Sequence, residues 1–312
     1  MVPSETKRQN VIVIVGATAS GKTALSIKVA RAIGGEIISA DSRQVYRGLD
    51  IGSGKITADE MKGVPHHLLD VAEASDVFTA SDFVQLGAVA LADIRTRNHV
   101  PIIVGGTGFY IDALLRRVSL ADVPPNESFR LQLSDYSLEE LQEKLRTCDP
   151  TRYETVDIKN PRRLVRAIEI AQVLGTTPAP PTKNMNPTEA PAAHHSNDVL
   201  WIGLTAPPEE LKKKIHIRLF ARICRGMLEE AQALHKNGLS YERMDELGLE
   251  YRYMARRLRG DMSHEEMTEV IEKESYRYAK RQMTWFKKNK SIHWFAPDEQ
   301  EEILMLIKEF IP

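Results

Sequence analysis

The stretch VIVIVGATASGKT (residues 11–23) decides the fold class of this chain. A run of aliphatic residues leads directly into GATASGKT, which fills every fixed position of the pattern G-x-x-x-x-G-K-[ST]. The aliphatic run predicts a buried strand, and the glycine-rich turn predicts a helix that opens near Lys22. Successive backbone N–H groups of such a turn, together with the positive end of the helix dipole, are suited to bind a phosphate. The stretch therefore predicts a phosphate-binding loop between a strand and a helix.

The segments around this loop alternate between strand and helix patterns. Aliphatic runs recur at residues 36–40, 101–104 and 199–204, and helical stretches such as 22–33 and 80–97 separate the first three strands. Continuous aliphatic runs, rather than alternating polar and apolar residues, indicate a sheet that is buried on both faces. We therefore predict an α/β fold, a P-loop NTPase-like parallel sheet flanked by helices.

A helical region interrupts this pattern. Between residues 119 and 175 no strand pattern is evident; Ser137 begins a capping box, and Asn160-Pro161 begins a helix that Gly175 ends. Residues 176–197 are rich in Pro, Ala, Thr and Asn, which is typical of a long loop or linker. The predicted organisation is a first part of the P-loop core at 1–118, an all-helical insertion domain with its linker at 119–197, and completion of the core with C-terminal helices at 198–312.

Two segments are strongly basic although the formal net charge of the 312-residue chain is −1. Residues 277–290 carry six Lys or Arg side chains and no acid, and residues 159–166 carry four and no acid. Clusters of this kind are typical of surfaces that bind a polyanion. Tyr278, Trp285 and Phe286 lie within the first cluster, as in surfaces that bind a nucleic acid; a solvated helix face is the alternative interpretation.

The cysteines and the hydropathy of the chain indicate in which cellular compartment the protein is expected. The two cysteines, Cys148 and Cys224, are far apart and lack a C-x-x-C partner. This excludes a disulfide framework and a thiolate zinc site, and it is typical of a reducing compartment. The sequence before the first strand has no apolar leader, and no apolar run reaches the length that a bilayer requires. We therefore expect a cytoplasmic protein without a membrane segment.

Further candidate groups follow the predicted strands. Asp41 comes after the second strand, and Gly105-Gly106-Thr107-Gly108 comes after the third. In a parallel sheet these strand ends meet at the same crevice as the first loop. There Lys22 supplies a positive charge to phosphate oxygens, and the Thr23 hydroxyl is a candidate ligand for Mg²⁺. The spacing leaves Asp41 open as a metal ligand, a general base or a helix cap.

Several blocks of the chain resemble the tRNA dimethylallyltransferases, also called tRNA isopentenyltransferases or IPP transferases. The resemblance extends over nearly the whole chain, in the family's order. The blocks are GATASGKT (16–23), ISADSRQVYRGLDIG (38–52), GVPHHLLD (63–70), PIIVGGTGFY (101–110), NPRRLVRAIEI (160–170) and YAKRQMTWFK (278–287). The blocks beyond the phosphate loop carry the assignment, because such a loop alone occurs in many families.

The resemblance implies a transferase that acts in tRNA modification. Such an enzyme moves a dimethylallyl group from dimethylallyl diphosphate to the exocyclic N6 amine of adenosine 37, next to the tRNA anticodon, and releases diphosphate. The phosphate loop then holds a leaving group rather than a nucleotide. The implied partners are tRNA and dimethylallyl diphosphate, the implied cofactor is Mg²⁺ with Thr23 as its ligand, and the family suggests a monomer.

The resemblance also implies roles for single residues. Asp41 is the expected general base, while Thr107 and Arg222 are expected to stabilise negative charge on the leaving diphosphate; Arg225 is the alternative to Arg222. The expected diphosphate contacts are Gly16, Ala17, Thr18, Ala19, Ser20, Gly21, Lys22 and Thr23. The expected tRNA contacts are Asp41, Ser42, Arg43, Gln44, Thr107, Arg130, Arg162, Arg163, Leu164, Val165, Arg166, Lys280, Arg281, Gln282, Met283, Thr284, Trp285, Phe286 and Lys287.

The chain departs from the family pattern at four places, two of which are DIGSGK (50–55) in place of DIGTAK and RLFARICRGMLEEA (218–231), where the spacing after the family's second arginine is about one helical turn shorter. Ala17 stands where the family usually has proline, and ELGLEYR (246–252) replaces a segment that helps to hold tRNA. Among alternative interpretations, the arginines at 162, 163 and 166 could pair with acids on neighbouring helices. The pair His66-His67 is expected to pack or form hydrogen bonds rather than bind a metal, because adjacent side chains rarely point the same way.

Two other functions compete with prenyl transfer. A small-molecule kinase or NTPase would use the same loop for ATP, but it leaves the basic C-terminal segment unexplained. An RNA-binding protein without catalytic activity would not require a filled loop and Asp41.

Overall fold

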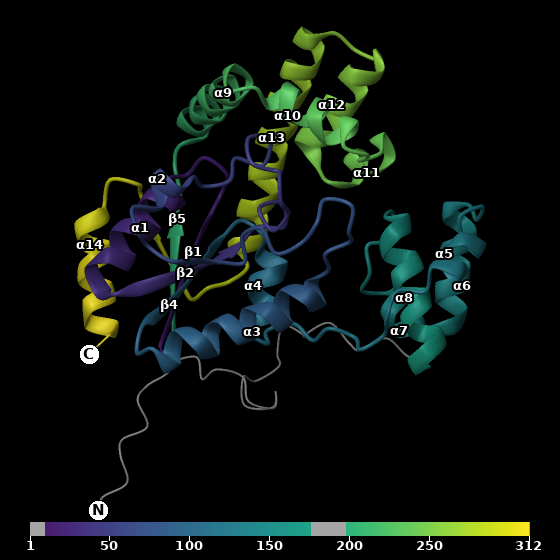
Figure 1. Cartoon of the computed structure of the whole chain (residues 1–312). Helices are drawn as coiled ribbons and strands as arrows, with labels where there is room; N and C mark the ends of the chain where they lie inside the picture. The colour runs from purple at the N-terminus through teal and green to yellow at the C-terminus, as the bar shows by residue number, and fades with distance from the viewer. Residues whose placement is uncertain (1–9, 176–197, 312) are drawn as a thin grey trace, which may run out of the picture. The chain divides into compact units, whose positions relative to one another are not determined.

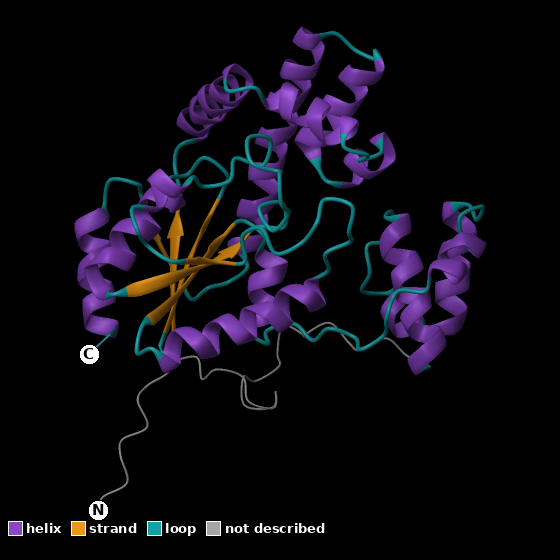
Figure 2. Cartoon of the chain, viewed as in Figure 1, coloured by secondary structure: helices purple, strands orange, loops and turns teal. Residues whose placement is uncertain are grey.

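The computed structural model describes residues 10–175 and 198–311, and its central element is a six-stranded parallel sheet (Figures 1 and 2). The strand order is β3-β2-β4-β1-β5-β6. The strands are β1 (Val11–Gly16), β2 (Gly35–Ala40), β3 (His66–His67), β4 (Val100–Gly105), β5 (Val199–Leu204) and β6 (Ile292–Phe295). The α/β fold and four of these strands confirm the prediction. The edge strands β3 and β6 were not predicted, because two and four residues are too short for a pattern.

Helices connect and flank the strands. The first unit contains α1 (Lys22–Ile33), α2 (Ala58–Met61), α3 (Ala80–Thr96), α4 (Gly108–Leu114), α9 (Pro208–Cys224), α10 (Met227–Lys236), α11 (Tyr241–Glu246), α12 (Leu249–Arg259), α13 (His264–Phe286) and α14 (Gln300–Phe310). The second unit contains α5 (Glu127–Gln132), α6 (Leu138–Cys148), α7 (Pro150–Tyr153) and α8 (Pro161–Leu174). Among the helices that the structure describes, none is long and apolar enough to cross a bilayer.

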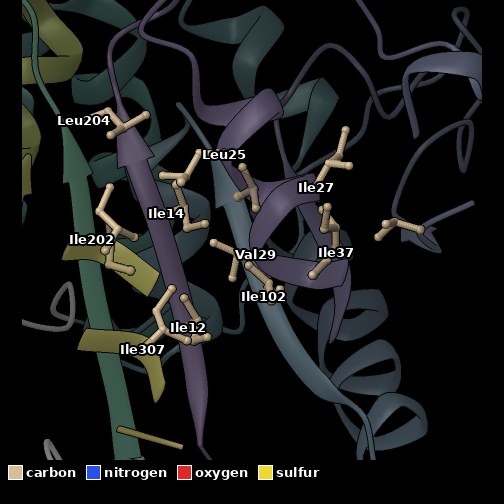
Figure 3. Packing of buried hydrophobic residues seen from close by; sticks show 14 of the residues in the cluster. Ile12, Ile14, Leu25, Ile27, Val29, Ile37, Ile102, Ile202, Leu204 and Ile307 are labelled. Carbon is tan, nitrogen blue, oxygen red and sulfur yellow. The ribbon is translucent and has the colours of Figure 1, made fainter. Parts of the chain in front are cut away.

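The sheet is buried on both faces, as its continuous aliphatic strands predict. Figure 3 shows Ile12 and Ile14 of β1 packed with Leu25 of α1, and Ile307 of α14 close to the same strand. The alternate residues Val13 and Val15 point to the other face and are equally inaccessible to solvent. Helices α3, α4 and α13 also contact the sheet. This packing fixes the carboxyl ends of β1, β2 and β4 relative to one another.

A second hydrophobic cluster lies outside the sheet within the same unit. Side chains of α10 to α13, including Met227, Tyr251, Met254 and Ile271, pack against apolar residues that follow β2. Tyr46 and Leu49 are among those residues. The segment after β2 is therefore packed against this layer of helices.

Of the residues that the structure describes, the second unit contains 115–175, and each element in this range is a helix. The predicted start of the insertion domain, residue 119, stays a prediction. The capping box at Ser137, the N-cap at Asn160 and the C-cap at Gly175 are confirmed. Its core joins α5, α6 and α8. The predicted linker, residues 176–197, lies outside the described residues.

Candidate functional site

The phosphate loop connects β1 to α1, as predicted, and its glycines are required by geometry. Gly16 has a φ of 149°, and a Cβ there would lie 2.6 Å from the carbonyl oxygen of Leu204. Gly21, the N-cap of α1, adopts the left-handed conformation with a φ of 97°. Only glycine adopts such angles at low cost. The close approach of β5 therefore explains the first glycine, and the entry into the helix explains the second.

Lys22 folds back onto this loop. Its Nζ donates hydrogen bonds to the carbonyl oxygens of Gly16 (3.0 Å) and Ala17 (2.6 Å). Desolvation and the positive charge of Arg218 lower the pKa of Lys22 to about 7, against the opposing effect of Asp41. A positive group in this state gains strongly from a nearby anion, because the anion favours its charged form.

Asp41 follows the carboxyl end of β2, where its side chain both caps a turn and lines a cavity. Its Oδ1 accepts hydrogen bonds from the backbone N–H groups of Arg43 (2.9 Å) and Gln44 (3.4 Å), so the carboxylate caps the following turn. The same side chain lines the cavity that contains Lys22. Asp41 can therefore cap the turn and take part in the site at the same time.

Thr107 connects the end of β4 to the turn after β2. Its N–H donates to the carbonyl oxygen of Ala40 (3.2 Å), and its Oγ1 accepts from the N–H of Ser42 (3.1 Å). These bonds hold the Gly-Gly-Thr-Gly turn beside Asp41. The strand ends therefore meet as the parallel topology predicts.

Two cavities open at this edge of the sheet. The smaller one, of about 110 Å³, is lined by the phosphate loop, Lys22, Thr23, Asp41 and Arg218. The larger one, of about 340 Å³, extends between α9, α12 and α13. The residues that line both cavities are Thr18, Asp41, Ser53, Arg218 and Tyr278. A carboxylate thus stands on the wall that a phosphate-binding cavity shares with a second cavity.

The arginine of the smaller cavity is Arg218, which the sequence analysis did not select. Arg222 lines only the larger cavity, where its Nη1 donates to the carbonyl oxygen of Gly52 (2.6 Å) and pairs with Glu250 (3.1 Å). Arg225 is the C-cap of α9 and lines neither cavity. Arg218, one helical turn before Arg222, is therefore the arginine that lines the phosphate cavity, and the clamping role expected of Arg222 stays a prediction. The signal was available, because residues four apart share one face of a helix.

Desolvation and the charge of Arg222 lower the pKa of Arg218. Arg218 also lies close to the loop after β2, since a Cβ on Gly54 would be 3.2 Å from its Nη2. Arg218, Arg222 and Lys22 therefore converge beside the carboxylates of Asp41 and Glu250, and the lowered pKa values of Lys22 and Arg218 favour binding of an anion.

The side chains of several α13 residues that were predicted to contact tRNA point into the protein. Gln282 is buried; its Oε1 accepts from the N–H of Thr18 (2.8 Å) and its Nε2 donates to the carbonyl oxygen of Gly106 (3.0 Å). Phe286 is buried in the protein, and the Trp285 Nε1 donates to Asp112 (2.9 Å). The side chains of Gln282 and Phe286 are therefore not available to RNA. Met283 is partly buried against a hydrophobic cluster. The exposed residues of this block are Lys280, Arg281, Thr284 and Lys287.

The basic residues of the second unit are largely engaged within it. Arg130 forms two hydrogen bonds of 3.0 Å to the buried Glu169, and Arg166 pairs with the same carboxylate. Burial raises the pKa of Glu169, but these hydrogen bonds outweigh burial and the pKa is lowered. Arg163 pairs with Asp157 at 3.4 Å. Arg163 and Arg166 therefore pair with acids, but not with acids on neighbouring helices: Asp157 precedes α8, and Glu169 lies on α8 itself.

Two further residues of this block differ in exposure. Leu164 is buried in the helical core, so its side chain is not available to RNA, and Val165 packs partly against that core. Arg162 is exposed.

The pair His66-His67 forms the short edge strand β3. The ring of His67 lies 2.7 Å from the buried carboxylate of Glu36, and His66 donates from Nδ1 to the carbonyl oxygen of Val64 (2.8 Å). Burial lowers the pKa of His66, which lines the smaller cavity. Hydrogen bonding, the preferred interpretation, is therefore confirmed for both rings.

Taken together, the parallel sheet, the filled phosphate loop and the converging cations define a P-loop α/β protein with a second cavity beside its phosphate site. The chain matches the family model described as IPP transferase over residues 44–289. It therefore belongs to the IPP transferase family, as its motifs predicted.

Similar proteins cover almost all of the chain. It is 39% identical over 306 residues to tRNA dimethylallyltransferase 1 of Geotalea uraniireducens, covering 95% of this chain and 97% of that protein. It is 43% identical over 284 residues to tRNA dimethylallyltransferase 2 of Treponema denticola, covering 90% and 92%. Among solved structures, a tRNA isopentenylpyrophosphate transferase from Bacillus halodurans matches with a TM-score of 0.72 and 32% identity, covering 97% of each chain.

Proposed function

We propose that this protein transfers a dimethylallyl group from dimethylallyl diphosphate to the N6 amine of adenosine 37 of tRNA. The observation that carries the proposal is the position of Asp41 on the wall shared by the two cavities. A transferase must bring a donor and an acceptor together at one point, with a base beside that point. The family membership supports the same reaction, since its relatives are named tRNA dimethylallyltransferases.

The smaller cavity is suited to the donor. Loop N–H groups, Lys22 and Arg218 would surround the diphosphate, and we assign to Arg218 the clamping role predicted for Arg222. As the amine nitrogen bonds to the allylic carbon, the bond from that carbon to the diphosphate oxygen breaks. Positive groups around that oxygen stabilise the charge that develops on it. The proton leaving the amine passes to the carboxylate of Asp41.

The residues of this cavity also fit Mg²⁺. The hydroxyl of Thr23 lines this space, and together with the phosphate oxygens of the donor it would supply the oxygen ligands that this ion prefers. A bound Mg²⁺ usually keeps several waters and uses one or two carboxylates with substrate phosphates, so a cluster of acids is not required. When bound, the ion would supply further positive charge to the diphosphate.

The larger cavity is suited to a nucleotide extruded from the anticodon loop. Its walls carry Arg43, Arg252 and Arg281, together with the aromatic rings of Tyr253 and Tyr278. Arginine planes and aromatic rings are the side chains on which unstacked RNA bases pack. Removing the base from its stack costs a few kcal/mol, which these contacts would offset. We further propose that Arg162, Lys280 and Lys287 contact the RNA backbone.

A transfer assay tests the proposal directly. The full chain is incubated with radiolabelled dimethylallyl diphosphate, Mg²⁺ and an unmodified anticodon stem-loop that carries adenosine 37. We expect label in this RNA and none in a guanosine-37 version, which lacks the N6 amine. We expect Asp41→Asn to lower kcat by at least ~100-fold, the usual contribution of a positioned base, while RNA affinity changes little.

ATP hydrolysis is measured alongside the transfer reaction. ATP turnover without prenylated RNA would make the protein a kinase or NTPase. Unchanged transfer by the Asp41→Asn variant would remove the proton-acceptor role while leaving the reaction in place.

A further inference from the structure

The carboxylate of Glu230, on α10, binds three consecutive backbone N–H groups of the loop after β2. Its Oε2 accepts from Asp50 (2.9 Å) and Ile51 (2.6 Å), and its Oε1 accepts from Gly52 (2.9 Å). Hydrogen bonds to a charged acceptor are stronger than neutral ones. Glu230 lines neither cavity, so nothing in the proposed chemistry accounts for this arrangement.

The loop held by Glu230 forms a wall of the donor cavity. Ser53, Gly54 and Ile56, which follow directly, line the smaller cavity, and Gly54 lies against Arg218. The loop is also held from its other side, because the carbonyl oxygen of Gly52 accepts a hydrogen bond from Arg222 (2.6 Å). The peptide groups on both sides of Gly52 are therefore fixed by charged side chains.

Tyr251 of α12 completes the arrangement. Its hydroxyl donates to Oε1 of Glu230 (2.7 Å), and its side chain is buried. A Cβ on Gly52 would lie 2.7 Å from the Tyr251 ring and hydroxyl, so the loop packs directly on this residue. The neighbours Glu250 and Arg252 on α12 line the larger cavity. Glu230 thus connects the wall of one cavity to a helix of the other.

We propose that Glu230 is a positioning residue for the donor site, which sets the loop 50–54 against Arg218 and so shapes the cavity for the diphosphate. The inference rests on the proposed function. It assigns to Glu230 no contact with either substrate.

The test uses the full-length chain and two variants that disturb the loop in different ways. Glu230→Gln replaces one acceptor oxygen by an NH₂ group, which cannot accept from the backbone N–H groups that face it. Gly52→Ala keeps the carboxylate but pushes the loop away from Tyr251. The matched control is Glu229→Gln, because Glu229 is exposed and adjacent.

We expect both loop variants to weaken binding of dimethylallyl diphosphate, measured by calorimetry without RNA, by at least ~10-fold. In the transfer assay the donor KM should rise similarly, whereas kcat at saturating donor and the Kd for the RNA stem-loop should stay within ~3-fold. The control should match the wild type. The double variant should be little worse than either single one, since both act through one loop.

Donor binding unchanged in folded Glu230→Gln, with only a lower Tm, would reduce Glu230 to a stability role and overturn the inference. If that variant does not fold, Gly52→Ala decides by the same criterion. A wild-type chain that binds dimethylallyl diphosphate but does not prenylate RNA would refute the proposed function. The role of Glu230 would still be decided by the ratio of the donor Kd of Glu230→Gln to the donor Kd of the wild type.

Discussion

At the scale of single residues, Asp41 shows how a polar group can serve the fold and the site together. One oxygen accepts a hydrogen bond from the N–H of Arg43 in the following turn, and the side chain lines both cavities. Hydrogen bonds from backbone N–H groups fix the orientation of a carboxylate, and a fixed orientation is what a general base requires. The hydrogen bonds that cap the turn therefore also orient the Asp41 carboxylate for its proposed role as a base.

Lys22 gives a prediction at the same scale. Its pKa of about 7 in the free protein means that it loses its charge as the pH rises above 7. A bound diphosphate favours the charged form and raises this pKa, so binding is strongest below pH 7 and takes up a proton above it. We expect the Kd for dimethylallyl diphosphate, measured by calorimetry, to rise between pH 7 and 9, by up to ~50-fold when the bound Lys22 keeps its proton over this range.

The control for this prediction is Lys22→Arg, because a guanidinium remains charged over the whole range. The ratio of the wild-type Kd to the variant Kd should increase with pH, which removes effects of the ligand's own titration. A ratio that stays constant between pH 7 and 9 would show that Lys22 keeps its proton in the free protein.

At the scale of elements, the sequence block 278–287 at the end of α13 has some side chains that face the protein interior and others that face solvent. Gln282 and Phe286 lie four residues apart and face inward, whereas Lys280, Arg281 and Lys287 face solvent. The helical repeat makes this division unavoidable in any block of consecutive residues. Gln282 also bridges the phosphate loop and the turn after β4. The helix thus supports the donor site with one face and presents cations on another.

The amino end of β2 gives a second prediction, about stability. Burial raises the pKa of Glu36, but hydrogen bonds from His67, Arg97 and His99 outweigh burial and lower the pKa to about 2. Because the folded-state pKa lies below the unfolded value of 4.5, this carboxylate stabilises the fold above pH 4.5, and the contribution is lost as the pH falls toward 2. The loss should be no more than ~3 kcal/mol.

Urea denaturation at several pH values measures this effect. We expect Glu36→Gln to be less stable than the wild type at pH 7 and to show a flatter dependence of the unfolding free energy between pH 4.5 and 2. Parallel curves for the two proteins across that range would rule out Glu36 as the source of the acid sensitivity.

At the scale of the whole molecule, residues far apart in sequence form each cavity. The smaller cavity combines residues between Thr18 and Gln282, contributed by the strand ends, α9 and α13. The second unit is a separate helical body with its own core, and its arginines Arg130 and Arg166 pair with the buried carboxylate of Glu169. The exposed cations of each unit, rather than every basic residue, are therefore the groups to test against RNA.

Binding of tRNA should accordingly be salt-dependent. We expect Arg162→Ala and Lys287→Ala each to weaken binding of tRNA and to reduce the slope of log Kd against log salt by about 1, as for loss of one phosphate contact. Lys308→Ala, an exposed lysine on α14, is the control and should leave the slope unchanged. Equal slopes for all four proteins would place the RNA elsewhere on the surface.

The sequence by itself determined the α/β class, the phosphate loop and the family, because these depend on local patterns. Aliphatic runs, a glycine-rich turn and capping residues act within a few positions of one another. Lys22 and Asp41 were found for the same reason, since each directly follows a buried strand or its turn.

Only the tertiary structure decided which basic and polar residues face the site. Arg218 rather than Arg222 reaches the smaller cavity, Gln282 turns inward, and Arg130 pairs with Glu169. The hold of Glu230 on residues 50–52 likewise joins segments that are distant in sequence. The physical reason is that a side chain's partner depends on long-range packing, which local spacing does not encode.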